Sequence, residues 1–301
     1  MTRFWRGAVA AVLTGALLAS AVAAPAMARK KPPAAAAAVS DENVAEIQAA
    51  LDEQRYVDAG RLIDKTVIAG MSDPRITLLS GELSLARGRY DEALKTFKQV
   101  EPAPALQARV HQGRGVALSL LGKSDEAFEV LKLAVSEDPK AWRAWNALGG
   151  EFDRRQDWKA ADDAYEHALT NSNRAAIVLN NRGFSRVLQN RLDDGIADLV
   201  AALQKKPDLT AARTNLRLAM GLKGDYERAL AAGPQEDKAA LLNNVGYAAM
   251  LRGDNDQAQD MFNKAIAARG QFYGRASSNL DMAEGLSART NPTIAPPNAH
   301  P

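Results

Sequence analysis

Residues 88–97 read GRYDEALKTF: a glycine, an aromatic residue two positions later, a small residue, and then a second ring. The same residue types return every 34 positions. The aromatic column runs through Tyr56, Tyr90, Ser124, Trp158, Leu192 and Tyr226, and the small column through Ala59, Ala93, Ala127, Ala161, Gly195 and Ala229. A third column holds Gly81, Gly115, Gly149 and Gly183. Three columns with one period predict a chain of stacked structural repeats.

One repeat, residues 142–175, shows what is stacked. Apolar and small side chains recur at helical spacing, first at Trp145, Leu148, Gly149 and Phe152 and then at Trp158, Ala161, Tyr165 and Ala168. Asp157 lies between the two sets, where it can cap the second helix. We therefore expect each repeat to be a pair of antiparallel helices, with Gly149 and Ala161 at their closest approach. Gly88, Gly122, Gly224 and Gly253 follow first helices and predict left-handed turns there.

The pattern W-x2-L-G-x2-Y, A-x3-F and a terminal proline at a period of 34 resembles the tetratricopeptide repeat. Repeats begin near residues 40, 74, 108, 142, 176 and 210, and the next begins near 239 because five residues are missing from the second helix of the sixth repeat. The resemblance implies an all-α, right-handed superhelical α-solenoid of about seven repeats over residues 41–286. A capping helix from about Gly274 to Leu286 would close it.

The two ends of the chain have a different composition. Arg3 and Arg6 precede an apolar stretch, and residues 26–28 read AMA, an A-x-A cleavage site. This predicts a signal peptide over residues 1–28, cleaved after Ala28, and export to a bacterial periplasm. The alternative is an uncleaved membrane anchor. Residues 29–40 are predicted to be a basic, alanine- and proline-rich linker, and residues 287–301 a disordered, proline-rich tail.

Composition excludes several function classes. Cleavage after Ala28 would leave 36 basic and 36 acidic residues, a balance that disfavours nucleic-acid binding. The absence of cysteine excludes thiol nucleophiles, disulfides and lipid attachment through an N-terminal cysteine. The pairs Asp162-Asp163 and Asp193-Asp194 are interpreted as surface charges. Because no catalytic, phosphate-binding or metal motif is present, we expect no enzymatic activity, no cofactor, no metal and no small-molecule substrate.

The resemblance also implies a function. A tetratricopeptide solenoid lines its concave wall with the first helices and holds other proteins there. Residues 243–266, NNVGYAAMLRGDNDQAQDMFNKAI, more narrowly resemble TadD-type proteins of tight-adherence (Flp) pilus assembly. Members of that group are commonly lipoproteins, whereas this chain has no cysteine. The expected role is a periplasmic scaffold in assembly of a pilus or secretion machine. The alternatives are a general periplasmic scaffold for envelope or peptidoglycan assembly and an accessory of outer-membrane secretion.

Asparagines recur in the first helices in phase with the repeat. They are Asn146, Asn180, Asn181, Asn215, Asn243, Asn244 and Asn279. Asparagine is a mediocre helix former, so its recurrence inside helices needs a reason. Its amide offers a donor and an acceptor, which match the backbone of a bound peptide. These seven residues are the predicted protein-binding site. The alternative is that each asparagine bonds within its own array and bridges adjacent helices.

Overall fold

The structure is a computed structural model that describes residues 39–100, 102–172, 175–231, 237–269 and 273–290. These residues form α-helices and one 3-10 turn, with no strand among them. The helices are α1 (Asp41–Asp52), α2 (Tyr56–Ile68), α3 (Pro74–Ala86), α4 (Tyr90–Val100), α5 (Gln107–Leu120), α6 (Ser124–Glu137), α7 (Trp142–Arg154), α8 (Trp158–Asn171), α9 (Ala175–Leu188), α10 (Leu192–Lys205), α11 (Thr210–Lys223), α12 (Tyr226–Ala231), α13 (Lys238–Arg252), α14 (Asn255–Arg269) and α15 (Gly274–Thr290). The turn, η1 (Pro104–Leu106), precedes α5.

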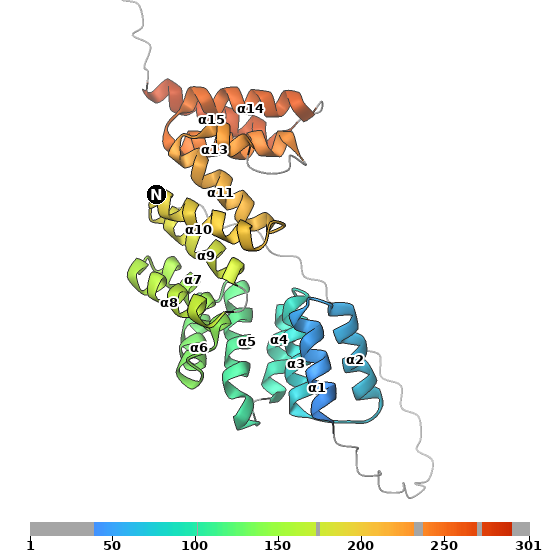
Figure 1. Cartoon of the computed structure of the whole chain (residues 1–301). Coiled ribbons are helices and arrows are strands. Elements are labelled where there is room, and N and C mark those ends of the chain that lie inside the picture. The colour runs from blue at the N-terminus through green and yellow to red at the C-terminus, as the bar shows by residue number, and fades with distance from the viewer. Residues whose placement is uncertain (1–38, 101, 173–174, 232–236, 270–272, 291–301) are drawn as a thin grey trace, which may run out of the picture. The chain divides into compact units, whose positions relative to one another are not determined.

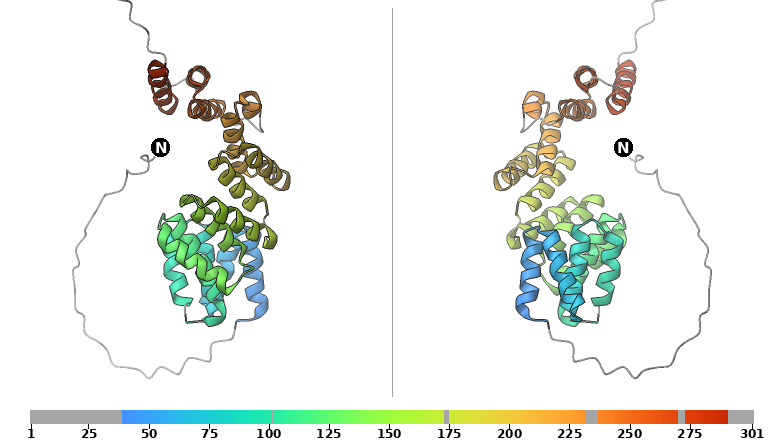
Figure 2. Two further views of the ribbon diagram at one scale, coloured as in Figure 1. Left: turned by 90° about the vertical axis from the view of Figure 1, so that its left-hand side faces the viewer. Right: turned by 90° about the vertical axis from the view of Figure 1, so that its right-hand side faces the viewer.

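Consecutive helices pair into hairpins, from α1 with α2 to α13 with α14 (Figure 1). Each odd-numbered helix also contacts the next odd-numbered helix, up to α13 with α15. The odd-numbered helices, called first helices below, therefore form one continuous layer, and the second helices pack on it (Figure 2). Seven hairpins and a final single helix confirm the predicted all-α superhelical repeat fold.

The closest contact within a hairpin joins a glycine of the first helix to a large side chain 16 residues later. The pairs are Gly81 with Phe97, Gly115 with Leu131, Gly149 with Tyr165, Gly183 with Leu199, and Gly246 with Phe262. A Cβ atom on any of these glycines would lie 2.6–2.9 Å from the partner side chain, closer than real Cβ contacts. The partner side chains are all buried. Glycine is therefore required so that a ring or a leucine can fill the space between two helices.

The backbones of the two helices approach each other closely in the fifth repeat. A Cβ atom on Gly195 would lie 2.8 Å from the carbonyl oxygen of Gly183. Gly195 occupies the small-residue column that holds alanine in the neighbouring repeats. The sequence prediction of a small residue on each helix at their closest approach is therefore met most directly here. In the first repeat, Ile47 replaces the glycine and packs in the same core cluster as Ile63, the residue 16 positions later.

The turn inside each hairpin has one conformation in all seven repeats. One residue in each turn, one or two positions after the first helix ends, has a positive φ. It is Gly88, Gly122, Gly224 and Gly253, as predicted, and also Gln54, Gln156 and Asn190. In each case the next residue donates its backbone N–H to a carbonyl five residues earlier, as in Arg89 to Ser84 (2.8 Å) and Asp157 to Phe152 (3.0 Å). This is the Schellman pattern that closes a helix C-terminus. The repeat imposes the left-handed turn even where the residue is not glycine.

The sixth repeat is shortened as the sequence predicts. Its second helix, α12, has 6 residues, whereas α10 and α14 have 14 and 15. Arg217 stands where the neighbouring repeats have the contact glycine. The residue 16 positions after Arg217 is Gly233. Because Gly233 has no side chain, the sequence carries no large partner residue at this position.

The structure differs from the prediction at the end of the last helix. The sequence predicts an end near Leu286, but α15 continues to Thr290, and Ser287 accepts a hydrogen bond from Gln259 on α14 (2.8 Å). At the other end, α1 begins at Asp41, and the hydroxyl of Ser40 caps it by accepting from Asn43 N–H (3.2 Å). The predicted signal peptide, residues 29–38 of the linker and residues 291–301 of the tail lie outside the described residues.

Substitutions at the left-handed turn test whether the flanking helices hold a non-glycine residue at a positive φ. Gln156→Gly should raise the free energy of unfolding by up to about 1 kcal/mol, because glycine adopts a positive φ without the steric cost of a Cβ atom. The reverse change, Gly122→Gln, should lower it by a similar amount, since nothing lies within 4 Å of a Cβ there and only the backbone responds. Urea denaturation followed by circular dichroism measures both. Changes of the same sign in the two variants would contradict this account.

Candidate protein-binding face

A single stripe of each first helix is repeated along the layer. It consists of residues i, i+4 and i+8, which lie on one face of a helix. The starting residues are Val44, Leu78, Gln112, Asn146, Asn180, Thr214, Asn243 and Ser278. We call the surface built from these stripes the first-helix face. Two pockets in the described chain are lined largely by this stripe and its neighbours, one towards each end of the layer.

The predicted asparagines lie in or next to this stripe and bond to one another. Asn215 donates to Asn180 (2.9 Å), Asn180 to Asn181 (2.9 Å), and Asn181 to Asn146 (3.0 Å). These bonds link α11 through α9 to α7. We call this chain of side-chain amides the asparagine relay. Asn180 is its centre and is buried, with 8% of its surface exposed.

A second, shorter relay joins α13 and α15. Asn279 donates to Asn243 (2.9 Å), and Asn243 donates to Asn244 (3.3 Å). Asn243 is buried, whereas Asn244 is exposed. The structure therefore brings all seven asparagines into the two relays, with the break falling at the shortened sixth repeat. The bridging geometry of the alternative interpretation is present, and peptide binding by these amides stays a prediction.

The sequence analysis missed an apolar row on the same face. Leu120, Leu188, Leu251 and Leu286 occupy one repeat position, and Tyr247 and Met282 lie four residues before the last two. These six side chains are 36–55% exposed and make up most of the exposed large apolar residues in the described chain. The row keeps the period of the repeat, so the same column count that found the glycines could have found it. What the sequence could not reveal is that these residues are exposed.

The pocket at the C-terminal end of the layer is called the C-terminal groove. It has a volume of about 810 Å³ and lies between α11, α13 and α15. Its apolar lining includes Leu218, Tyr247 and Leu251, and its amides include Asn243, Asn244 and Asn279. Apolar surface beside a few polar groups is typical of a binding site for another molecule.

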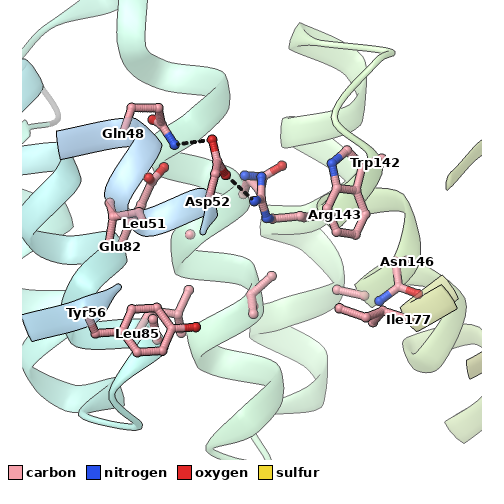
Figure 3. A pocket seen from close by; sticks show the side chains of 15 residues that line it. Gln48, Leu51, Asp52, Tyr56, Glu82, Leu85, Trp142, Arg143, Asn146 and Ile177 are labelled. Atoms are coloured by element: carbon pink, nitrogen blue, oxygen red, sulfur yellow. Dashed lines mark hydrogen bonds and ion pairs between the residues drawn. The ribbon is translucent and has the colours of Figure 1, made fainter. Parts of the chain in front are cut away.

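The pocket at the N-terminal end is smaller, about 290 Å³, and is called the N-terminal pocket (Figure 3). Its lining comes from α1, α2, α3, α5, α7 and α9. An ion pair joins Asp52 on α1 to Arg143 on α7 (3.2 Å), 91 residues apart, and Gln48 donates to the same carboxylate (3.2 Å). Arg109 of α5 contacts both Glu82 (2.8 Å) and Gln48 (2.6 Å). Contacts within the chain therefore bridge the first helices around this pocket.

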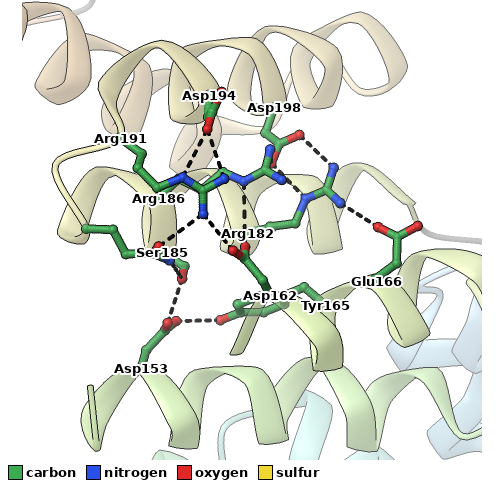
Figure 4. A network of polar contacts seen from close by, with 11 residues as sticks. Asp153, Asp162, Tyr165, Glu166, Arg182, Ser185, Arg186, Arg191, Asp194 and Asp198 are labelled. Carbon is green, nitrogen blue, oxygen red and sulfur yellow. Dashed lines mark hydrogen bonds and ion pairs between the residues drawn. The ribbon is translucent and has the colours of Figure 1, made fainter. Parts of the chain in front are cut away.

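A network of polar and charged side chains connects the fourth hairpin (α7 and α8) to the fifth (α9 and α10) (Figure 4). Asp153 accepts hydrogen bonds from Tyr165 (2.8 Å) and Ser185 (2.6 Å). Burial raises the pKa of Asp153, and the two hydrogen bonds partly oppose that effect. Asp198 is buried and holds Arg182 through two bonds of 2.8 Å. Each of these groups is bonded to other groups of the array, which is the geometry of a structural network.

The acidic pairs considered in the sequence do not act together as acid and base. Asp162 accepts from Arg191 (2.6 Å), while Asp163 pairs with Lys159 (3.1 Å). Asp194 also pairs with Arg191 (2.9 Å). Among the described residues there is no cluster of three or more metal-binding side chains. No helix within that part of the chain has the length and hydropathy needed to cross a membrane.

Comparison with known proteins agrees with this architecture. Residues 108–140, which contain α5 and α6, match the family model of the tetratricopeptide repeat. A crystal structure of a tetratricopeptide repeat protein from Parabacteroides merdae is similar in fold, with a TM-score of 0.50 and 14% identity over 81% of this chain and 98% of that one. Proteins with these repeats are generally non-enzymatic scaffolds that bind other proteins.

Two curated proteins resemble part of this chain. The human protein O-mannosyl-transferase TMTC1 is 26% identical over 176 residues, which cover 55% of this chain and 20% of that protein. Protein FlbA of Caulobacter vibrioides is 30% identical over 151 residues, which cover 48% of this chain and 25% of that protein. The chain thus spans a quarter or less of the length of these relatives.

Substitutions in the two relays test whether these amides stabilise the layer of first helices. Asn180→Ala removes two relay bonds in a buried position and leaves Asn215 without its acceptor, so it should lower the free energy of unfolding by about 1–3 kcal/mol. Asn244→Ala removes one acceptor at an exposed position and should cost less than about 0.5 kcal/mol. Urea midpoints of the two variants check this. Equal losses would show that the relay does not stabilise the layer.

Proposed function

We propose that this chain is a non-enzymatic periplasmic scaffold that holds partner proteins on its first-helix face. Its task is the assembly of a pilus or secretion machine of the cell envelope. The observation that carries the proposal is the apolar row, because six large side chains are exposed on the one surface that the repeats share. Monomeric proteins rarely expose apolar side chains in register unless another protein covers them.

The position of the row favours a protein partner over a small molecule. The row has one member on α5 (Leu120), one on α9 (Leu188) and two each on α13 and α15, so it extends along the layer of first helices. A segment of protein chain can follow such a row from repeat to repeat, as solenoid ligands do. The amides beside it add hydrogen-bonding groups that do not depend on the ligand's side chains.

The envelope assignment is supported by the first 28 residues. Basic residues, an apolar stretch and an A-x-A site are the parts of a secretory signal. The pilus assignment is supported by the resemblance of residues 243–266 to TadD-type proteins. A general scaffold for envelope or peptidoglycan assembly is the alternative, and the two differ in the partner they hold.

Photo-crosslinking from the first-helix face tests the proposal. A photoreactive phenylalanine derivative placed at Leu251 or Leu188 should give adducts with a subunit of a pilus or secretion machine, identified by mass spectrometry. The matched control is Leu133 on α6, which is as exposed as these residues (49%) but lies on a second helix, and it should give none. The mature protein from the same envelope fraction should begin at Arg29.

Each result has a distinct meaning. Adducts with peptidoglycan-assembly proteins would favour the alternative scaffold. Equal crosslinking from Leu133 would contradict the binding face. An intact N-terminus at Met1 or Thr2 in membranes would replace the exported form with an anchored one.

A further inference from the structure

We propose that the outer face of α2 is a self-association surface, through which two copies of this chain pair in an antiparallel, twofold-symmetric way. The surface consists of Val57, Arg61, Asp64 and Ile68, and we call it the α2 face. The inference goes beyond the proposed function and does not depend on it, because α2 is a second helix and lies outside the first-helix face.

The α2 face carries the two most exposed large apolar side chains of the described chain. Ile68 is 85% exposed and Val57 is 70% exposed. The four residues of the face follow one another at steps of four, three and four positions, so they lie along one side of the helix. The opposite side of α2, which includes Ile63, is buried in the core of the first repeat. The apolar residues of the α2 face are therefore not needed for packing within the chain.

Apolar residues at these positions distinguish the first repeat from the others. The residue that corresponds to Val57 is charged in each of the other six repeats, namely Asp91, Asp125, Lys159, Asp193, Glu227 and Asp256. In the third, fourth and fifth repeats, the residue that corresponds to Ile68 is polar, namely Ser136, Thr170 and Gln204. A polar outer face is what a helix at the protein surface usually has. The apolar α2 face therefore indicates a surface that another molecule covers.

The order of residues along the α2 face makes it complementary to itself. From one end to the other, the face reads apolar, basic, acidic and apolar. A twofold axis through the middle of the face would place Val57 opposite Ile68 of the second copy, and Arg61 opposite Asp64 of the second copy. Because a twofold axis repeats every contact, the pair would contain two apolar contacts and two ion pairs. A second copy of the chain thus supplies the complementary surface without any further requirement.

The two central charges can reach a second chain. The side chain of Arg61 is 76% exposed, and its guanidinium lies 3.4 Å from the carboxylate of Asp58 on the same helix. Asp58 also binds Arg55 at 3.2 Å, so Arg61 shares this acid with another arginine. Asp64 is exposed as well and would give Arg61 of the second copy a further carboxylate. Exposed ion pairs add little affinity, so the charges set the direction of pairing and the apolar contacts supply most of the affinity.

The extent of the α2 face predicts a weak dimer that leaves the first-helix face open. Because α2 has only 13 residues, a pair of such helices is expected to bury less than the ~1,200–2,000 Å² of a stable interface. We expect a dissociation constant on the order of 10–100 µM. The α2 face contributes no side chain to the N-terminal pocket or the C-terminal groove. Two linked chains would hold a repetitive partner more tightly than one chain does.

Sedimentation velocity of the purified protein over a range of concentrations tests the inference. The mass of the native protein should rise from one chain towards two as the concentration increases. Val57→Asp introduces the residue that the second, third and fifth repeats hold at this position, so it should keep the fold. It should weaken the dimer at least about tenfold, because a carboxylate would then be buried against Ile68. Leu133→Asp on α6 is the matched control, an exposed apolar residue of another second helix whose change should leave dimerisation unaltered.

Charge reversal tests the twofold arrangement. Arg61→Asp would place two acidic side chains opposite each other, and Asp64→Arg would place two arginines opposite each other. Each variant alone should therefore be monomeric at concentrations where the native protein pairs. An equimolar mixture of the two variants should form a heterodimer, because each introduced charge then faces its opposite on the other chain.

Several results would overturn the inference. They are a single-chain mass at ~1 mM native protein, dimers that persist in Val57→Asp, and charge-reversed variants that stay monomeric when mixed. Monomeric protein that cosediments with phosphatidylglycerol vesicles, and loses this binding in Val57→Asp, would assign the α2 face to a membrane instead. Circular dichroism melting verifies that each variant is folded. Crosslinking from Leu251 should be the same in Val57→Asp as in the native chain, so failure of the dimer is distinguishable from failure of the proposed function.

Discussion

A glycine beneath a large side chain sets the distance between the two helices of a hairpin, and the rest of the structure depends on it. In five repeats a Cβ atom at that glycine would lie within 2.9 Å of the partner side chain. The ring or leucine fills the space so completely that it is buried. Since all these hairpins are closed by the same contact, they stack with the first helices in one layer. The shared first-helix face follows from that stacking.

The sixth repeat lacks this contact, and the layer of first helices changes at that repeat. In the sixth repeat, Arg217 replaces the glycine and the second helix shortens to 6 residues. The asparagine bonds, continuous from α7 to α11, begin again on α13. The C-terminal groove lies across this junction, between α11, α13 and α15. The repeat that lacks the glycine contact thus lies beside this groove.

The sequence predicted those parts of the fold that depend on residue size and period. Gly149 with Tyr165, the turn glycines and the short α12 could all be read from columns of residue type. Three positive-φ turns that the glycine columns could not predict lie at Gln54, Gln156 and Asn190, because there the flanking helices rather than the residue force the conformation. The end of α15 was missed because the bond between Gln259 and Ser287 depends on packing that leaves no local signal.

The candidate site was less accessible to sequence reasoning. The asparagine columns were found, but whether an amide faces a ligand or a neighbouring amide depends on the distance between helices. Asn180 lies close enough to both Asn215 and Asn181 to bond with each. An exposed Leu251 and a buried Leu242 look alike in sequence, so the apolar row appeared only when burial was known.

A double-mutant cycle on Gly149 and Tyr165 tests the central claim most directly. If the glycine is required by the ring, Gly149→Ala in the native chain should lower the free energy of unfolding by about 1–3 kcal/mol. In a Tyr165→Ala background the same change should cost almost nothing, because the added Cβ atom then meets empty space. A coupling energy above about 0.5 kcal/mol between the two sites is the predicted result. Additive losses would contradict the account, since they would show that the ring does not fix the place of the glycine.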